Sequence, residues 1–351
     1  MKKFKLLFCA LILLLGSCSV KNYLNLDEKE LVEDEKEDSE KKLDEDEKEE
    51  YPLYTIYGTT LYFGSYPQSE VTDSSLKSAL SSKYGTLPTS SNFNGWTDYE
   101  YYADGSKQSY MWYKDISYGD DKYRAVYFTS YRPYYGGYSS SAGNSYQDDN
   151  GYSLSTVYYF KYEPIEWTIL SNDGKEVFVV ANIALDSQSY DYDGSYNNNY
   201  ANSTISAWLN DIFYNTAFSD DEQRLIKTTT VDNGVASTGY STNQYACENT
   251  NDKIFLLSYK EVTNSSYGFS SAYNNYDTAR QKKSTDYAKV QGCWKSTSSS
   301  YLGNCYWWLR SPFFSNDSNA RYVDDDGYVG YDDYVDYCYG GVVPAFHINL
   351  E

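Results

Sequence analysis

Histidine is almost absent from this 351-residue sequence: His347 is the only one, and it stands three residues after Pro344 near the end of the chain. Nucleophilic sites of the Ser-His-Asp or Cys-His kind need an imidazole as general base, so they have a single candidate here. A structural role in a C-terminal strand explains His347 more simply. Zinc is disfavoured too, because no C-x-x-C pair accompanies the lone histidine.

Hydrophobic runs long enough to span a membrane are also missing. The ten apolar residues Leu6 to Leu15 follow three lysines and are too short for a membrane-spanning helix. They end in Leu15-Gly16-Ser17-Cys18, which resembles the lipobox of bacterial lipoproteins, whose cysteine is acylated. The resemblance implies a signal peptide over residues 1–18 and a lipid anchor on Cys18, with the protein facing outside the cytoplasm in a bacterial cell envelope. An ordinary secretory signal with a chance cysteine is the alternative.

Positive charge is scarce: 29 Lys and Arg stand against 50 Asp and Glu, a net charge of −21. Residues 27–50 hold fifteen acids and five lysines, which is −10. Such a segment cannot bury enough apolar surface to fold, and charge repulsion keeps it extended. We expect residues 19–50 to be an acidic disordered stalk, with an acidic partner-binding tail as the alternative. The net charge argues against nucleic acid and anionic lipid headgroups as ligands.

Tyrosine takes the place of aliphatic residues in the rest of the chain. There are 44 tyrosines, whose rings can be buried while their hydroxyls stay hydrogen-bonded, and aromatic residues favour strands. Residues 51–351 therefore predict a single α+β domain, mostly antiparallel sheet with a few short helices and long loops. Residues 84–156 are rich in Gly, Ser and Tyr and predict a loop-rich insertion, with one clear strand at 123–131.

Strands are predicted most clearly around residues 162–183. Asp173-Gly174 lies between two apolar runs and predicts a β-hairpin, because glycine tolerates the positive φ of a tight turn. Residues 61–69 predict a short strand that ends at the turn-forming Pro67. Four further segments are expected to be ordered: a buried strand leading into a turn or a helix at 253–262, a helix at 284–293, and strands at 305–312 and 341–350.

Two helices carry start signals. The first has an apolar stripe at helical spacing, formed by Ile205, Trp208, Leu209, Ile212 and Phe213. Asn202 or Ser203 can cap it. The second begins at Ser219, and Glu222 three residues later completes a capping box.

Six short motifs carry a family resemblance. They are FGSYPQ (63–68), PIEW (164–167), AWLN (207–210), IFLLS (254–258), YWWLRSP (306–312) and the terminal GVVPAF (341–346). Together they resemble an uncharacterised family of bacterial secreted and surface domains, over roughly residues 60–350 without the insertion. The family's usual ending looks like G-V-R-P-A-F, and Val343 stands where that Arg is expected. The order of elements is more distantly similar to C-type-lectin-like domains, including the formylglycine-generating-enzyme branch, and implies such a fold. The resemblance carries over no catalytic residue.

Few cysteines remain once Cys9 leaves with the signal peptide and Cys18 takes lipid. The other four are Cys247, Cys293, Cys305 and Cys338. Export permits disulfides, and four cysteines allow three pairings. Cys293 and Cys305 bracket a short polar loop, so we expect these two to be bonded.

Carboxylates are the remaining candidates for catalysis. Glu163 and Glu166, beside Trp167, would suit a glycan hydrolase, which needs two carboxylates. Polar positions on a strand explain them more simply. No glycine-rich phosphate loop or dinucleotide fingerprint follows a predicted strand. We therefore expect a binding protein, and keep a carboxylate-dependent glycan hydrolase and a structural envelope protein as alternatives.

Calcium is the one cofactor that the sequence leaves open. DDDG at 324–327 looks like part of an EF-hand loop, but Tyr322 then takes the first position and Asp333 the twelfth. An EF-hand places an acid at the first of these and Glu at the twelfth. No other metal or cofactor is expected.

The segment 313–341 is the predicted binding surface. It contains no Lys, Glu, Gln, Met or Trp. Tyrosine gives rigid contact area at low entropy cost, and Asp, Asn and Ser give adaptable hydrogen bonds, as in antibody loops. Val323, Val329 and Val335 are expected to point inward, leaving the residues between them to contact an extracellular protein or a glycan. The candidate ligand-binding residues are Asn316, Asp317, Asn319, Arg321, Tyr322, Asp324, Asp325, Tyr328, Tyr331, Asp332, Tyr334, Asp336 and Tyr337.

The composition of this segment has a second implication. Every residue type in it can be encoded by a codon that ends in a pyrimidine. This set is similar to the products of diversity-generating retroelements, which rewrite adenines and often act on C-type-lectin-like surface proteins near their C-termini. The resemblance implies a diversified binding module. Overall composition is the alternative, because residues 131–146 lack the same five residue types.

Overall fold

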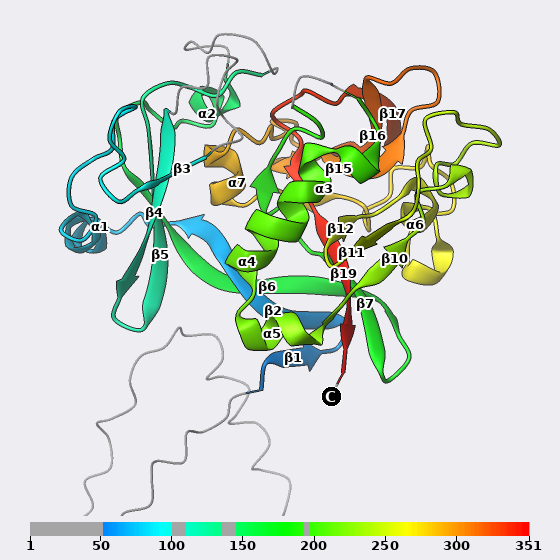
Figure 1. Cartoon of the computed structure of the whole chain (residues 1–351), viewed down its shortest axis with the longest axis horizontal. Helices are drawn as coiled ribbons and strands as arrows, with labels where there is room; N and C mark the ends of the chain where they lie inside the picture. The colour runs from blue at the N-terminus through cyan, green and yellow to red at the C-terminus, as the bar shows by residue number, and fades with distance from the viewer. Residues whose placement is uncertain (1–51, 100–109, 135–144, 193–196, 351) are drawn as a thin grey trace, which may run out of the picture. The chain divides into compact units, whose positions relative to one another are not determined.

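A ten-stranded antiparallel sheet carries the fold in the computed structural model, which describes residues 52–99, 110–134, 145–192 and 197–350 (Figure 1). Its strands are β1 (Tyr54–Tyr57), β2 (Thr60–Glu70), β3 (Thr97–Asp98), β4 (Met111–Tyr118), β5 (Asp121–Phe128), β6 (Tyr158–Asn172), β7 (Glu176–Ala181), β9 (Ile226–Lys227), β12 (Phe255–Leu256) and β19 (Pro344–Asn349). The predicted signal peptide and stalk, Cys18 included, lie outside the described residues.

Strand β6 holds this sheet together. It is 15 residues long and pairs with β5 along its first part, with β2 along its middle and with β7 at its end. The β6–β7 hairpin confirms the prediction from Asp173-Gly174, and Gly174 has the positive φ of 86° that the turn needs. Trp167 of β6 is fully buried and its indole N–H donates to the carbonyl of Phe63 at 2.8 Å. Two of the motifs therefore meet in the core.

Strand β2 is longer than predicted. It continues through Pro67, which pairs with Tyr162 of β6, and register shifts flank the proline on both sides. Proline lacks an N–H group and is tolerated at such irregular places in a sheet. Gly64 of the same motif has a φ of 70°, and a Cβ there would lie 2.6 Å from the ring of Phe218. The FGSYPQ motif thus encodes a bent strand and a close packing contact.

Residues 84–156 contribute strands of their own. The predicted strand appears as β5, and β4, which the sequence did not predict, pairs with it from Met111↔Phe128 to Tyr118↔Asp121. A small second core covers this end of the sheet and is formed by Val71, Leu80, Trp96, Trp112, Ile116, Tyr123, Ala125, Tyr127 and Tyr159.

The helices are short. They are α1 (Ser74–Ser81), α2 (Tyr146–Asp149), α3 (Thr204–Trp208), α4 (Tyr214–Ala217), α5 (Asp220–Leu225), α6 (Tyr259–Val262) and α7 (Asp286–Val290). A π-helical turn (Leu209–Phe213) joins α3 to α4 over the predicted apolar stripe, and Ser203 caps α3 through the N–H of Ser206. Ser219 and Glu222 form the predicted capping box at α5. Across the described ranges, none of these helices has the length and apolar character needed to cross a membrane.

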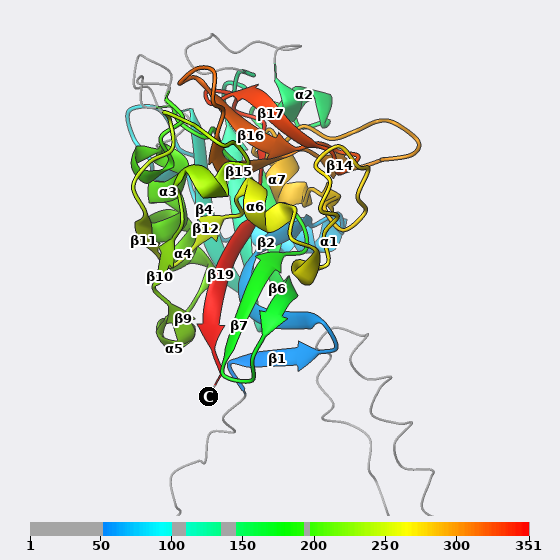
Figure 2. The same cartoon turned by 90° about the vertical axis from the view of Figure 1, so that its right-hand side faces the viewer.

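A second, five-stranded sheet forms the opposite end of the domain. In spatial order it consists of β17 (Val329–Tyr334), β16 (Asn319–Val323), β15 (Trp307–Pro312), β18 (Gly341–Val342) and β8 (Asp186–Ser187). All neighbours pair antiparallel except β15 and β18. Figures 1 and 2 both place β16 and β17 at the end of the domain away from β1 and from the last residues of β19.

Smaller elements complete the described chain. Two-stranded pairs are formed by β10 (Thr229–Val231) with β11 (Thr250–Asp252) and by β13 (Lys282–Lys283) with β14 (Asn304–Cys305). The 3-10 turns are Tyr200–Asn202, Val235–Ser237 and Ser265–Tyr267. The predicted α+β class, with antiparallel sheet and short helices, is therefore what this part of the chain adopts.

Candidate functional site

The predicted binding segment lies on β16, β17 and the loops beside them. Val323, Val329 and Val335 are at most 1% exposed, so the predicted inward anchors are confirmed. Beside them in the sheet, Trp307 pairs with Val323, and both Trp307 and Trp308 of β15 are completely buried. The segment therefore rests on a packed base.

A β-bulge shapes the outer strand of this sheet. Ala320 pairs with Asp333 and Tyr322 pairs with Gly330, so two residues of β17, Tyr331 and Asp332, oppose the single residue Arg321 of β16. A bulge of this kind breaks the strict alternation of side chains and re-aims the residues within it. Both Tyr331 and Asp332 are exposed as a result.

Three large rings of the segment are exposed to solvent: Phe314 at 47%, Tyr331 at 42% and Tyr334 at 51%. Phe314 contacts Tyr240 with ring centroids 4.5 Å apart, and Tyr331 stacks on Phe313 at 5.5 Å. These contacts hold the exposed rings in place, which lowers the entropy that a bound partner would have to remove. We call the exposed residues Phe314, Asp317, Tyr331, Asp332 and Tyr334 the C-terminal face.

Most of the other predicted residues are only half-buried and border this face. They are Asn316, Tyr322, Asp324, Asp325, Tyr328, Asp336 and Tyr337. The ring of Tyr322 lies flat against Gly330, where a Cβ would come within 2.3 Å of it, and packs on Tyr306 at 5.5 Å. Tyr322 is thus partly a structural residue.

Two predicted contact residues are inside the protein, and the sequence-based assignment is corrected for both. Asn319 and Arg321 are each only 4% exposed. The Asn319 side chain donates to the carbonyl of Asp332 and so supports the bulge. The guanidinium of Arg321 lies between the rings of Tyr240 and Tyr259, 4.4 and 4.3 Å from their centroids. Burial lowers the pKa of Arg321, and the two rings supply the cation–π contacts that offset it.

A group of three carboxylates in the described residues is close enough to hold a metal ion. The ligand atoms of Asp324, Asp325 and Asp326, at the β16–β17 turn, lie within 4.8 Å of one another. Asp324 already accepts the backbone N–H of Asp325, and Asp326 accepts that of Tyr328, each at 2.8 Å. These are ordinary interactions of a tight turn and account for the cluster.

All four described cysteines are free thiols, so the predicted Cys293–Cys305 disulfide is not formed in this structure. Both residues are completely buried and close together. A hydrogen bond with Cys293, together with burial, raises the pKa of the Cys305 thiol. The predicted disulfide is therefore wrong for this structure, although the two thiols are neighbours.

His347 has the structural surroundings that its position suggested. Its ring stacks on Phe178 with centroids 4.4 Å apart, and Nδ1 bonds to the carboxylate of Glu176 at 2.6 Å. Burial lowers the pKa of His347 despite that carboxylate. The imidazole is held between β7 and β19.

Glu163 and Glu166 share one open groove with a volume of about 730 Å³. Glu163 accepts the backbone N–H and the hydroxyl of Ser69 at 3.1 and 2.8 Å, and Glu166 accepts the amide of Asn182 at 3.4 Å. Lys283 lines the same groove. The two acids are therefore brought together, each with a hydrogen-bond partner of its own.

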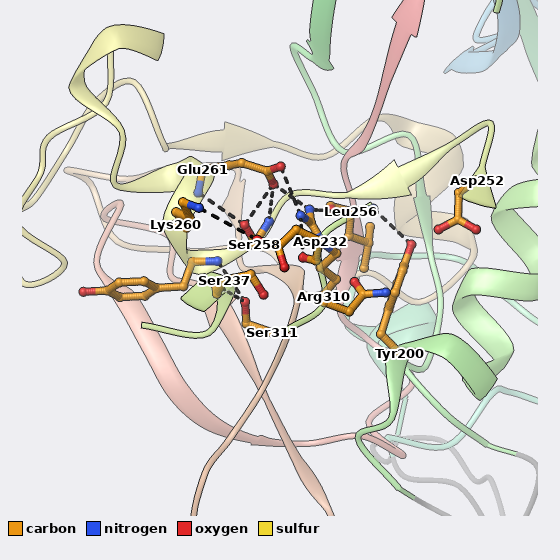
Figure 3. A network of polar contacts seen from close by, with 12 residues as sticks. Tyr200, Asp232, Ser237, Asp252, Leu256, Ser258, Lys260, Glu261, Arg310 and Ser311 are labelled. Carbon is orange, nitrogen blue, oxygen red and sulfur yellow. Dashed lines mark hydrogen bonds and ion pairs between the residues drawn. The ribbon is translucent and has the colours of Figure 1, made fainter. Parts of the chain in front are cut away.

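A polar network joins two of the sequence motifs, YWWLRSP and IFLLS (Figure 3). Arg310 of YWWLRSP is 2% exposed and donates to both oxygens of Glu261 at 2.5 and 3.0 Å, and to the carbonyl of Leu256 at 2.7 Å. Glu261 also forms the capping box of α6 with Ser258. Ser311 accepts the N–H of Tyr259 at 2.9 Å. These motif residues fasten α6 to β15, so their role is structural.

A smaller cavity of about 250 Å³ was not predicted at all. It is lined by Tyr66, Arg124, Asp186, Trp208 and Tyr287, among others. These residues are scattered over more than two hundred positions, and none carries a local signal. Only the unusual burial of an acid could have drawn attention to the site, and burial is not visible in the sequence.

Comparison with known proteins gives one match. A family described as a domain of unknown function (DUF6273) matches residues 174–350, just over half of the chain. No curated protein and no solved structure matches. The matched region contains the helices α3 to α7, the Arg310–Glu261 network and the C-terminal face. The chain belongs to the DUF6273 family.

Proposed function

We propose that this protein is a lipid-anchored binding module of a bacterial cell envelope, and that its C-terminal face binds an extracellular protein. Lipid on Cys18 and the acidic segment 19–50 would hold the domain outside the cytoplasm. One observation carries the proposal: Phe314, in the loop before β16, and Tyr331 and Tyr334, on β17, are exposed, whereas Val323, Val329 and Val335 of the same segment are buried. Rigid exposed rings are the residues in which binding energy concentrates.

The position of the face supports this role. β1 begins the described domain, and β16 and β17 lie at the far end from it in both views (Figures 1 and 2). A domain attached through its N-terminus would present the C-terminal face away from the attachment.

Charge favours a basic partner. Residues 313–341 contain seven Asp and one Arg, and that Arg321 is buried between two rings. The surface charge is therefore negative. Oppositely charged surfaces speed up association and fix its specificity, and the effect weakens with salt. Lys and Arg of the partner can also contact the exposed Tyr rings directly.

The test compares outward and inward substitutions. The full chain is applied to arrays of purified extracellular proteins and of glycans, and the affinity of each hit is measured. Tyr331→Ala or Tyr334→Ala should cost more than about 2 kcal/mol of binding. The same changes should alter the free energy of unfolding by no more than about 0.5 kcal/mol. The control Val329→Ala should act in the opposite way and lower the stability of the fold more than it lowers binding. Outward variants with full affinity, or binding to glycans alone, would overturn the proposal.

The finer parts of the proposal concern fold and diversity. We further propose that the domain has a C-type-lectin-like fold, a proposal supported by the order of its elements. If the segment 313–341 is diversified, sister copies in one genome should differ at Tyr331, Asp332 and Tyr334. They should keep Val323 and Val329. Uniform divergence along the whole chain would contradict diversification.

A glycan hydrolase remains the second candidate because Glu163 and Glu166 line one groove. Paired carboxylates on either side of a glycosidic bond are the requirement for this reaction. Release of reducing sugar from envelope glycans, lost in Glu166→Gln, would support this function. If no glycan of the panel releases reducing sugar, the hydrolase function is refuted.

A further inference from the structure

The small cavity of about 250 Å³ lies between the β2–β5 part of the main sheet and the helices α3 and α7. Its aromatic lining comes from five side chains: Tyr66, Tyr99, Tyr113, Trp208 and Tyr287. Cavities for drug-sized ligands measure about 300–1,000 Å³, so this one admits a smaller molecule. None of its residues belongs to the C-terminal face.

A buried carboxylate forms part of the cavity wall. Asp186 of β8 is 2% exposed and accepts three hydrogen bonds, from the hydroxyl of Tyr66 at 2.6 Å, the N–H of Ser187 at 2.7 Å and the amide of Gln188 at 3.2 Å. All three donors are neutral. In the described part of the chain no Lys, Arg or His forms an ion pair with Asp186. A buried carboxylate is costly unless an opposite charge compensates it.

Arg124, a cation in the cavity wall, already forms an ion pair with another residue. Arg124 donates through Nε and Nη2 to both oxygens of Asp115 at 2.8 and 3.0 Å, and through Nη1 to the hydroxyl of Tyr287 at 3.2 Å. Its guanidinium lies 4.0 Å from the ring centroid of Tyr113. Asp98, which is half-buried, and Asp211, which is exposed, add two further carboxylates to the lining. The cavity therefore combines aromatic walls with a buried carboxylate, Asp186, on which the positive charge of Arg132 acts without a direct ion pair in the described residues.

We propose that this cavity binds a small organic ammonium ion, the amine of an amino sugar or of a lysine side chain. Aromatic rings attract cations through their negative faces, and the attraction grows when water is excluded. Asp186 would gain a directly paired counter-charge, in addition to the longer-range effect of Arg132. The apolar edges of Tyr66 and Trp208 would cover the carbon skeleton that carries the amine.

The ionisation of Asp186 provides a second, pH-dependent test of the proposal. Burial raises the pKa of Asp186 to about 6. The groups that act on it are Tyr66 from β2, Gln188, Arg132 and, from α7, Tyr287. None of these four changes charge between about pH 5 and pH 7.5, and neither does an aliphatic amine. Binding of an ammonium ion should therefore strengthen about tenfold over this range, as the carboxylate ionises.

The test uses two matched pairs of probes with the full chain in calorimetry. Glucosamine is compared with N-acetylglucosamine, and Nα-acetyl-lysine methylamide with its norleucine analogue, which lacks the amine. We expect one charged probe to bind, its neutral partner to bind at least about thirtyfold more weakly, and the affinity to rise with pH. The pair that responds identifies the source of the amine, sugar or side chain.

Measurements on two variants test whether the probes bind in the cavity. Asp186→Asn should weaken binding by at least about thirtyfold and abolish its pH dependence. Asp220→Asn, an exposed carboxylate at the start of α5 that lines neither the cavity nor the C-terminal face, is the matched control and should change neither. Equal affinity for charged and neutral probes, absence of binding by both charged probes, or full affinity in Asp186→Asn would overturn the proposal. If Asp186→Asn does not fold, the probe pairs and the pH series on the native chain decide it alone.

Discussion

Glu261→Gln should lower the free energy of unfolding by about 3–5 kcal/mol, the usual cost of removing one partner from a buried ion pair. In the native protein Glu261 binds both Nη atoms of Arg310 and accepts the N–H of Ser258 at 2.7 Å. Glutamine would turn an NH₂ group toward the guanidinium. Arg310, 2% exposed, would then keep its charge in the interior without a counter-ion. At roughly 2 °C per kcal/mol for a domain of this size, the Tm should fall by about 6–10 °C.

Urea titration followed by tryptophan fluorescence, together with calorimetry, measures this effect. Glu166→Gln is the control, because Glu166 is exposed and should change stability by no more than about 0.5 kcal/mol. Replacing Glu261 and Arg310 together by Met should recover much of the loss, since an apolar pair removes the stranded charge. A loss below about 1 kcal/mol in Glu261→Gln, or an equal loss in the control, would refute the reasoning.

Three further predictions concern other buried groups. Because burial raises the pKa of Asp186 to about 6 from 3.8, its protonated form is favoured in the folded state. Native stability should therefore fall by about 3 kcal/mol as pH rises from below 4 to above 6, and urea melts of Asp186→Asn should lack that fall. Mild oxidation should leave Cys293 and Cys305 unbonded, because both thiols are free and completely buried, and peptide mapping without reductant is the check. Gly340→Ala should destabilise by about 1–3 kcal/mol in the same melts, because the new Cβ would lie 2.1 Å from Nε1 of Trp308.

Local signals in the sequence were enough for the elements that depend on neighbours along the chain. Asp173-Gly174 predicted the β6–β7 hairpin, and Ser219 with Glu222 predicted the start of α5. In both cases the groups that stabilise the element lie within four residues of each other. Pro67 misled the same reasoning, because the register shifts that accommodate it arise from the partner strand β6.

The features that the sequence did not predict depend on contacts between residues far apart in the chain. Arg321 was expected at the surface, but Tyr240 and Tyr259, more than sixty positions away, enclose it. Asp186 drew no attention because its partner Tyr66 is 120 residues away. The candidate face was recognised from composition alone, and its exposed members could be separated from its buried members only once the bulge opposite Arg321 was known.

The family match begins at Gly174, inside the turn between β6 and β7. Residues 174–350 expressed alone would lose the strand that pairs with one whole side of β7. They would also lose Trp167, which fills the core beside Phe346. The edge left open would be the sequence EVFVVA, an apolar strand without gatekeeper charges in its middle, and such edges recruit other chains. The unit that can be produced as an intact fold is therefore residues 52–350, which begins well before the family match does.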